Sequence, residues 1–167
     1  MVKKLNPVAR ISDLELSSMS KGSVYASEDG NISELLKLTK LGCTYSEVPP
    51  GKSGCPFHVH HAEDEMFVIL EGDGEYRFGE DRYAVGAGDV LGAPVGGPEY
   101  AHQLFNTGTS SLKYLSISSK AEIEICEYPD TNKIGFYGKR AGGGTRFRHI
   151  TRDGMSLDYD DGDEGAR

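Results

Sequence analysis

Three of the five histidines of the chain lie within four residues, at His58, His60 and His61. On an extended strand, residues two positions apart point to the same face, so the imidazoles of His58 and His60 converge while Val59 packs behind them. Two imidazoles on one face supply half of the ligands that a divalent metal ion needs. The pair therefore predicts a metal site.

Glu65 is the candidate for an anionic third ligand. It follows a polar stretch suited to a turn, residues 61–64, and it opens the most apolar run of the chain, Met66–Leu70. If a hairpin closes at that turn, the carboxylate of Glu65 returns toward His58 and His60. A buried carboxylate is costly without hydrogen bonds or a cation, and a divalent ion compensates its charge directly.

His102 is the fourth candidate ligand, because it lies between a turn-rich loop, residues 94–101, and another short strand, residues 103–106. His61 has a different expected role. It is adjacent to His60 on the strand, so its side chain faces the opposite side. We expect His61 to be solvated or to touch the site only from outside.

Short β-prone runs, separated by glycine or charged turns, must position these side chains. A spacing near ten residues with turn signals between is typical of an all-β sandwich or barrel. Glycines at 72, 79 and 88 offer the positive φ that such turns need. We expect one or two helical turns within Ile11–Met19, and we expect Pro129 to end the strand region. The predicted strands are Leu35–Leu41, Cys43–Val48, Glu65–Leu70, Glu75–Phe78, Asp81–Val85, Asp89–Ala93, Gln103–Phe105, Leu112–Ser118 and Ile123–Tyr128.

Two segments, in the right order, resemble the two sequence motifs of the cupin family. Residues 51–72 are similar to the first motif, and Gly51 lies one residue farther from His58 than in the usual pattern. Residues 88–106 are similar to the second motif, with five residues rather than two between Gly96 and His102. The matching positions are His58, His60, Glu65 and Gly72 in the first segment and Gly88, Pro94, Gly96, His102 and Asn106 in the second.

The resemblance implies an all-β fold, a cupin-type double-stranded β-helix barrel, or jelly roll. The barrel is expected at residues 35–128, after an N-terminal arm at 1–34 and before a C-terminal extension with an acidic tail at 129–167. It also implies a divalent metal ion held by His58, His60, Glu65 and His102, and often a homodimer. More closely, the chain is similar to a group of small bacterial cupins of unassigned function, so the fold does not name the reaction.

The predicted ligand set of nitrogen and oxygen atoms suits Fe, Mn, Ni, Co or Zn and does not select among them. Four protein ligands leave one or two positions of an octahedral ion open for water or substrate. Cys55 lies three residues before His58. We interpret it as a small apolar filler rather than a redox-sensitive thiol or a weak ligand.

Two main functions are consistent with such a site. The first is a metal-dependent enzyme, a dioxygenase or an isomerase or lyase, acting on a small acid, phenol or sugar in the barrel pocket. The second is a non-catalytic module that binds or senses a small molecule, and an empty structural barrel is a third reading. No catalytic base is assigned, since Tyr45, Tyr76 and Tyr100 are only positional candidates.

The composition argues against some classes of binding partner. With 26 acidic against 18 basic residues and a net charge of −8, the chain lacks the clustered positive charge of a nucleic-acid binder. No apolar run approaches the roughly 20 residues of a membrane span, and no apolar stretch follows the basic start. Three cysteines without a Cys-x-x-Cys pair fit a reducing compartment. We therefore expect a cytoplasmic protein, with a homodimer in which the arm is exchanged.

The C-terminal extension combines a basic segment, residues 133–152, with an acidic one, residues 158–164. The basic segment is either a clamp for anions over the barrel mouth or a set of charges that offsets the acidic end. The acidic segment lacks the alternating oxygen ligands of a calcium loop, so we interpret it as a solvated tail. His149, within the basic segment, is expected at the surface.

Overall fold

The structure is a computed structural model that describes residues 6–138 and 147–152. The acidic segment 158–164 and the glycines at 142–144 lie outside the described residues. The described elements are almost all strands, which confirms the predicted all-β class. The strands are β1 (Ser17–Lys21), β2 (Tyr25–Asn31), β3 (Leu41–Val48), β4 (Val59–His60), β5 (Glu65–Glu71), β6 (Asp73–Phe78), β7 (Asp81–Gly86), β8 (Val90–Ala93), β9 (His102–Asn106), β10 (Leu112–Ser119), β11 (Ile123–Tyr128), β12 (Lys133–Gly138) and β13 (Phe147–Arg152).

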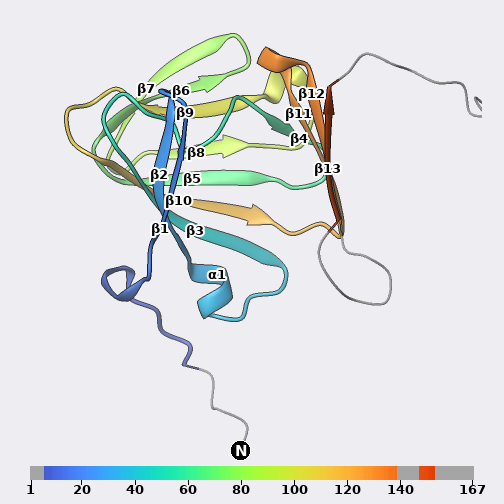
Figure 1. Cartoon of the computed structure of the whole chain (residues 1–167). Coiled ribbons are helices and arrows are strands. Elements are labelled where there is room, and N and C mark those ends of the chain that lie inside the picture. Colours follow the sequence, from blue (N-terminus) through green and yellow to red (C-terminus); the bar gives the residue numbers. More distant parts are fainter. Residues whose placement is uncertain (1–5, 139–146, 153–167) are drawn as a thin grey trace, which may run out of the picture.

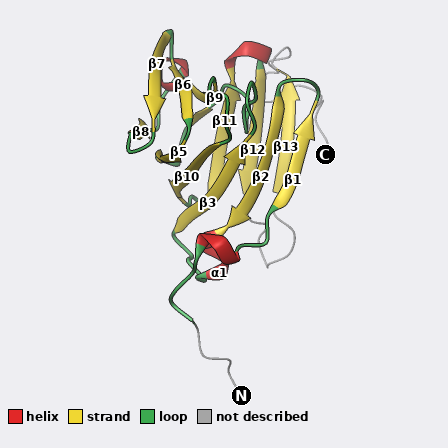
Figure 2. Cartoon of the chain, turned by 90° about the vertical axis from the view of Figure 1, so that its left-hand side faces the viewer, coloured by secondary structure: helices red, strands yellow, loops and turns green. Residues whose placement is uncertain are grey.

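The strands form two facing walls of antiparallel sheet (Figure 1). One wall is a six-stranded sheet in the order β1-β2-β3-β10-β5-β8. The other combines the order β13-β12-β11-β4 with the order β7-β6-β9, and a bridge between His58 and His102 joins these two groups. The helical elements are single turns at the ends of the strands (Figure 2), namely η1 (Ile11–Asp13), α1 (Ile32–Leu35), η2 (Pro98–Tyr100) and η3 (Pro129–Thr131).

The apolar core lies between the two walls. Along β5, buried Phe67 and Ile69 alternate with more exposed neighbours, as expected for a strand with one face inside. Leu112 of β10 is completely buried in the same cluster. The rings of Tyr76 and Tyr114 lie about 6 Å from the ring of Phe67, with centroid distances of 6.1 and 5.9 Å. This packing fixes the barrel around the neighbouring polar site.

The predicted turn glycines are confirmed. Gly72, Gly79 and Gly88 have φ values of 86°, 57° and 96°. At Gly72 the space is also closed, because a Cβ atom there would lie 2.7 Å from the carbonyl oxygen of Ser111. Only glycine satisfies both conditions at this hairpin.

The predicted strand Leu35–Leu41 is wrong. The chain instead forms α1, because the side chain of Asn31 accepts a hydrogen bond of 2.9 Å from the backbone N–H of Glu34 and caps the turn. Lys37 then takes a left-handed conformation with φ 58°. The strand therefore begins only at Leu41.

The predicted helical turn within Ile11–Met19 is confirmed as η1, and Met19 itself lies in β1. The expectation for the other end of the barrel needs correction. Pro129 ends β11, but the chain reverses at Asn132, where φ is 48°, and β12 pairs with β11. The missing N–H of a proline stops its own strand and does not prevent the next one from joining the sheet.

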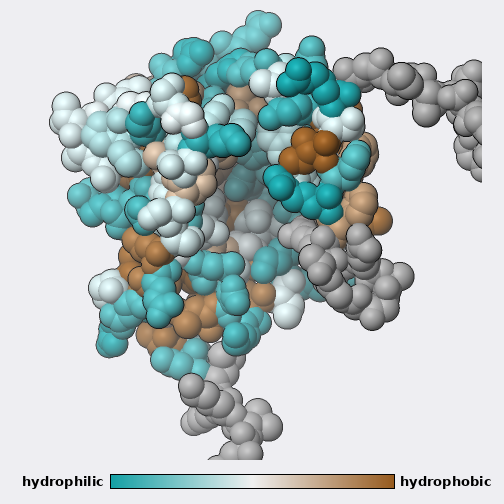
Figure 3. Space-filling view, in the orientation of Figure 1, coloured by the Kyte–Doolittle hydropathy of each residue, from teal (hydrophilic) through white to brown (hydrophobic). Residues whose placement is uncertain are grey.

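The surface is mixed. Hydrophilic residues cover most of the face in Figure 3, and apolar residues gather at its lower left, in the area of α1 and the N-terminal segment. No helix within residues 6–138 and 147–152 is long and apolar enough to cross a membrane. The exposed apolar side chains of the N-terminal region include Ile11, Leu16, Leu35, Leu38 and Leu41.

Candidate metal centre

The structure brings the four predicted ligands together between the two walls. His58 directly precedes β4 and His60 ends it, and His102 and Glu65 open β9 and β5. Glu65 Oε2 lies 3.1 Å from His102 Nε2, 3.5 Å from His60 Nε2 and 3.9 Å from His58 Nε2. One ligand atom from each residue lies within 4.8 Å of the others.

Backbone hydrogen bonds explain why His58 and His102 meet. The N–H of His102 donates to the carbonyl of His58 at 2.8 Å, and the N–H of His58 donates to the carbonyl of His102 at 3.1 Å. The two residues are thus a directly opposed, hydrogen-bonded pair of antiparallel chains, whose side chains share one face. Their ring centroids lie 4.5 Å apart.

The outer nitrogens of these rings are occupied by other partners. His58 Nδ1 lies 2.8 Å from the carbonyl oxygen of Pro56, and His102 Nδ1 lies 3.3 Å from that of Tyr100. A carbonyl only accepts, so Nδ1 of each ring carries a proton. Nε2 then either donates to Glu65 from a protonated ring or, in a neutral ring, offers its lone pair to a cation. In the neutral form, a cation between the lone pairs and the carboxylate removes their repulsion. The residues present therefore fit a divalent metal ion.

Two of the four residues, His58 and Glu65, have the protonation states of metal ligands. Burial lowers the pKa of His58 to about 4, and the neighbouring charges of His102 and His60 act in the same direction. Burial raises the pKa of Glu65, but hydrogen bonds with His102 and His60 outweigh it and bring the value to about 2. At neutral pH, His58 is a neutral imidazole and Glu65 a carboxylate, the forms that bind a metal. Burial lowers the pKa of His60, but hydrogen bonds with Cys126 and Glu65 outweigh it and raise the value to about 11, so His60 must release a proton when a metal binds.

Glu124 of β11 supports His60 from behind, and our sequence reasoning missed it. Its carboxylate is buried and accepts backbone hydrogen bonds from His61 at 2.9 Å and Ala62 at 3.0 Å. One of its oxygens lies 3.5 Å from His60 Nδ1, and the thiol of Cys126 lies 3.3 Å from the same nitrogen. The sequence signal that could have identified Glu124 is the alternation along β11, which places its carboxylate on the same face as buried Cys126.

The remaining candidates lie outside the cluster. His61 Nε2 is 2.7 Å from Glu127 Oε1 on the surface, as expected for a side chain on the opposite side of the strand. His149 is exposed. Cys55 is half-buried next to the site, and desolvation, followed by the charges of Glu65 and Asp29, raises the pKa of its thiol to about 12. The thiol is thus protonated at neutral pH.

A cavity of about 310 Å³ opens next to the four ligands. Two of the tyrosines considered as bases donate elsewhere, Tyr45 to Glu47 Oε1 and Tyr76 to the carbonyl of Gly92, and Tyr100 is partly exposed. The tyrosine that lines the cavity is instead Tyr114, which was not among the predicted candidates. The lining residues are Asp29, Thr44, Ser46, Gly54, Cys55, His58, Glu65, Phe67, Tyr114 and Ser116.

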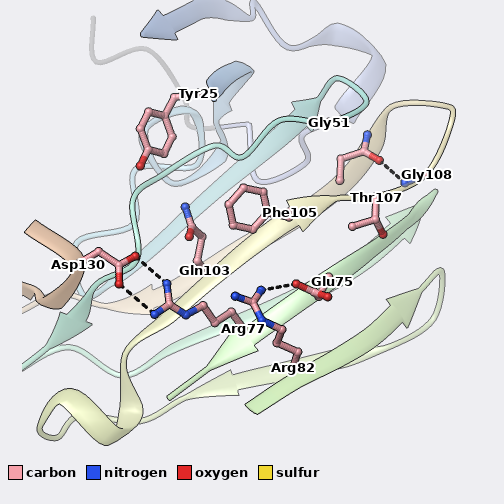
Figure 4. A pocket seen from close by; sticks show the side chains of 11 residues that line it. Tyr25, Gly51, Glu75, Arg77, Arg82, Gln103, Phe105, Thr107, Gly108 and Asp130 are labelled. Atoms are coloured by element: carbon pink, nitrogen blue, oxygen red, sulfur yellow. Dashed lines mark hydrogen bonds and ion pairs between the residues drawn. The ribbon is translucent and has the colours of Figure 1, made fainter. Parts of the chain in front are cut away.

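A larger hollow of about 710 Å³ lies elsewhere, over β6 and β9 (Figure 4), and contains none of the four ligands. Its two guanidinium groups are already paired. Arg77 makes two hydrogen bonds to Asp130, at 2.6 and 2.9 Å, and Arg82 pairs with Glu75. The guanidinium carbon of Arg77 also lies 3.5 Å from the centre of the Phe57 ring. The charges of both guanidinium groups are therefore compensated locally.

Comparisons with known proteins agree with this architecture. Residues 44–118 match the family described as Cupin domain. The chain is 33% identical over 113 residues to an uncharacterized protein of Methanocaldococcus jannaschii, which covers 62% of this chain and 87% of that protein. It is 32% identical over 71 residues to the oxalate-binding protein of Thermotoga maritima, which covers 42% of this chain and 55% of that protein.

A solved structure extends the similarity to almost the whole chain. The crystal structure of a sugar phosphate isomerase from a cupin superfamily, from Silicibacter pomeroyi, superposes with a TM-score of 0.75 at 20% identity and covers 92% of this chain and 98% of that one. The chain belongs to the cupin family, with the double-stranded β-helix fold that its motifs predicted. Cupin domains commonly bind divalent metals, and the histidine and glutamate group described above could hold one.

Proposed function

We propose that this cupin binds a divalent metal ion through His58, His60, Glu65 and His102 and acts on a small oxygen-rich molecule in the adjoining cavity. The observation that carries the proposal is the convergence of three Nε2 atoms on a single oxygen of Glu65. Two of the three outer Nδ1 atoms are turned to backbone carbonyls, which leaves the inner lone pairs free for a cation.

Iron, manganese, nickel, cobalt and zinc all suit the three imidazoles and one carboxylate. An ion bound there supplies either Lewis-acid polarisation of a carbonyl or enolate, or activation of oxygen. The residues of the chain have separate tasks. The four ligands fix where the reacting end of the molecule lies, and Phe67 and Tyr114 of the cavity wall limit its size.

Between reaction types, the similar structure from Silicibacter pomeroyi favours proton transfer, since that protein is named a sugar phosphate isomerase. The alternative is capture of a small ligand without turnover. The name of the Thermotoga maritima relative, an oxalate-binding protein, favours this second candidate. Both candidates use the same four ligands and the same cavity.

Reconstitution of the protein with metal distinguishes the enzyme from the ligand-binding module. Metal-free protein would be loaded anaerobically with each of the five metals and mixed with small acids, phenols and sugars, and product would be followed by mass spectrometry with oxygen uptake in parallel. Product formation with at least one metal supports the enzyme. Calorimetric binding without product supports the binding module, and neither binding nor product with any metal contradicts the proposal.

We further propose a homodimer in a reducing, cytoplasmic compartment. Exposed apolar side chains of η1, α1 and the adjoining chain support the dimer, because a second copy would cover them. Cys43, Cys55 and Cys126 are all free thiols, which supports the compartment. Light scattering at micromolar concentration tests the dimer, and a monomeric mass contradicts it.

A further inference from the structure

The cavity wall contributed by the six-stranded sheet is a row of polar side chains in register. Asp29 of β2 is paired with Ser46 of β3, and Ser46 is paired with Tyr114 of β10. Directly paired residues of an antiparallel sheet share a face, so all three point the same way. Each of them lines the cavity together with His58 and Glu65. The row therefore faces the proposed metal centre across the cavity.

Two buried serines hold the carboxylate of Asp29 in place. Ser46 Oγ donates to Asp29 Oδ1 at 2.6 Å, and Ser27 Oγ donates to Asp29 Oδ2 at 2.7 Å. Ser27 and Ser46 are only 3% and 4% exposed, so solvent does not compete for these contacts. Each carboxylate oxygen has a second lone pair. Asp29 therefore keeps an acceptor position on each oxygen in a fixed orientation.

The neutral serines do not remove the negative charge of Asp29. The charge of Asp29 acts within the cavity. Burial has the largest effect on the pKa of the Cys55 thiol, and the charges of Glu65 and Asp29 raise this pKa further. The same two carboxylates act on Tyr114, whose pKa burial raises well above its ordinary value. The far end of the cavity is thus an acidic surface that attracts hydrogen-bond donors and repels anions.

We propose that Asp29 is a ligand-binding residue that accepts hydrogen bonds from the hydroxyl groups of a neutral polyhydroxylated molecule, a sugar or polyol, whose other end reaches the metal centre. The proposal rests on the function proposed above and narrows its ligand class. Hydroxyl groups of Thr44 and Ser116 on the same wall both donate and accept, and that of Ser46, which donates to Asp29, can still accept, which suits such a ligand.

The same wall disfavours anionic ligands. A phosphate ester at the Asp29 end would bring like charges together inside a cavity of about 310 Å³. A dicarboxylate such as oxalate carries no hydroxyl to donate to Asp29. This chain would therefore select the free sugar over its phosphate ester, despite its structural similarity to a sugar phosphate isomerase.

The test uses the full-length protein loaded with Mn²⁺. Calorimetry would measure the affinity for D-erythrose, D-ribose and D-glucose, for the terminal phosphate ester of each sugar, and for oxalate. We expect at least one free sugar to bind about 10-fold more tightly than its ester and than oxalate. Paramagnetic relaxation of the sugar protons by Mn²⁺ would report whether the bound sugar lies near the metal.

The variant Asp29→Asn keeps the shape of the side chain and removes its charge. We expect it to weaken sugar binding by about 10- to 100-fold, the range for a charge-assisted hydrogen bond, with an unchanged manganese content. Asp81→Asn, at an exposed position of β7, is the matched control and should bind sugar like the unaltered protein. Ser27→Ala, which removes one support of the carboxylate, should cause a smaller loss and serves if Asp29→Asn does not fold.

Two outcomes overturn this inference while leaving the metal site intact. One is a manganese-loaded protein that binds none of the sugars, or binds the phosphate esters or oxalate more tightly. The other is an Asp29→Asn variant with undiminished sugar affinity. A failure of the proposed function looks different, because the unaltered protein would then take up no metal. Sugar binding by that metal-free protein, lost in Asp29→Asn, would still support the role of Asp29.

Discussion

His60 and His61 are neighbours with opposite roles, and they provide a matched pair of probes. The ring of His60 lies in the cluster with Glu65, whereas that of His61 bonds Glu127 on the surface. We predict that His60→Ala lowers metal affinity at least about 100-fold because one ligand is lost. His61→Ala should keep the affinity of the unaltered protein. Calorimetric titration with Zn²⁺ measures both, and equal losses would show that His60 is not a ligand.

Glu124 positions His60 and should influence the metal without touching it. The backbone N–H groups of His61 and Ala62 donate to different oxygens of Glu124, and in a glutamine one of these becomes an NH2 group, which does not accept. We predict that Glu124→Gln lowers metal affinity by about 10- to 100-fold, as for outer partners of ligating histidines. Glu127→Gln, on the same strand but at the surface, is the control and should have no effect. A well-folded Glu124→Gln variant of normal affinity would contradict this role.

The sequence predicted the four residues of the cluster better than the residues that support them. His58 and His60 follow from alternation along one strand, and Glu65 from the polar turn before an apolar run. The five residues between Gly96 and His102 left the position of His102 open, and the single turn η2 takes up part of this length and lets His102 open β9. Asp29 could not be predicted, because its contacts depend on register between strands far apart in the sequence. Alternation along β11 marks Glu124 as facing inward but does not show its contact with His60.

The hairpin between β5 and β6 depends on Gly72. An alanine there would have an unfavourable positive φ, and its Cβ would meet the carbonyl oxygen of Ser111 at 2.7 Å. We predict that Gly72→Ala lowers the free energy of unfolding by about 1–3 kcal/mol. Gly51→Ala, also at positive φ but in open space, isolates the backbone cost and should lose less. Urea denaturation measures both, and a larger loss at Gly51 would contradict the steric argument.

Most strands could be predicted from the sequence because apolar residues alternate along them and glycine turns separate them. The predictions failed where local chemistry competed with the pattern. The Asn31 cap converts the predicted start of Leu35–Leu41 into α1. After Pro129, the left-handed Asn132 returns the chain to the sheet as β12, which a proline signal alone does not indicate.

The two walls of the barrel meet in an apolar core around Leu112, which is completely buried. Leu112→Ala leaves a cavity there, so we predict a loss of about 2–5 kcal/mol in the free energy of unfolding. Leu70→Ala, at a side chain that is 40% exposed, is the matched control and should lose far less. Similar losses for the two variants in urea denaturation would show that Leu112 does not join the walls.

The whole metal-free protein should become less stable as the pH falls from about 6.5 to 5. In the folded state the pKa of His58 is about 4, whereas in the unfolded chain it is near 6.5. In this interval the unfolded state binds a proton that the folded state does not, which favours unfolding. Urea titrations in the presence of a chelator measure the effect. His58→Gln should flatten the dependence, and an unchanged slope would contradict the assignment of a neutral His58.

Both proposed functions of the protein require one divalent ion among His58, His60, Glu65 and His102. The direct measurement is elemental analysis of protein purified without a histidine tag, before and after reconstitution with each of the five metals, for the unaltered chain and for His102→Ala. We predict about one ion per chain in the unaltered protein and a large loss in His102→Ala. An unaltered chain that takes up none of the five metals, or a His102→Ala variant that retains full occupancy, would contradict the account.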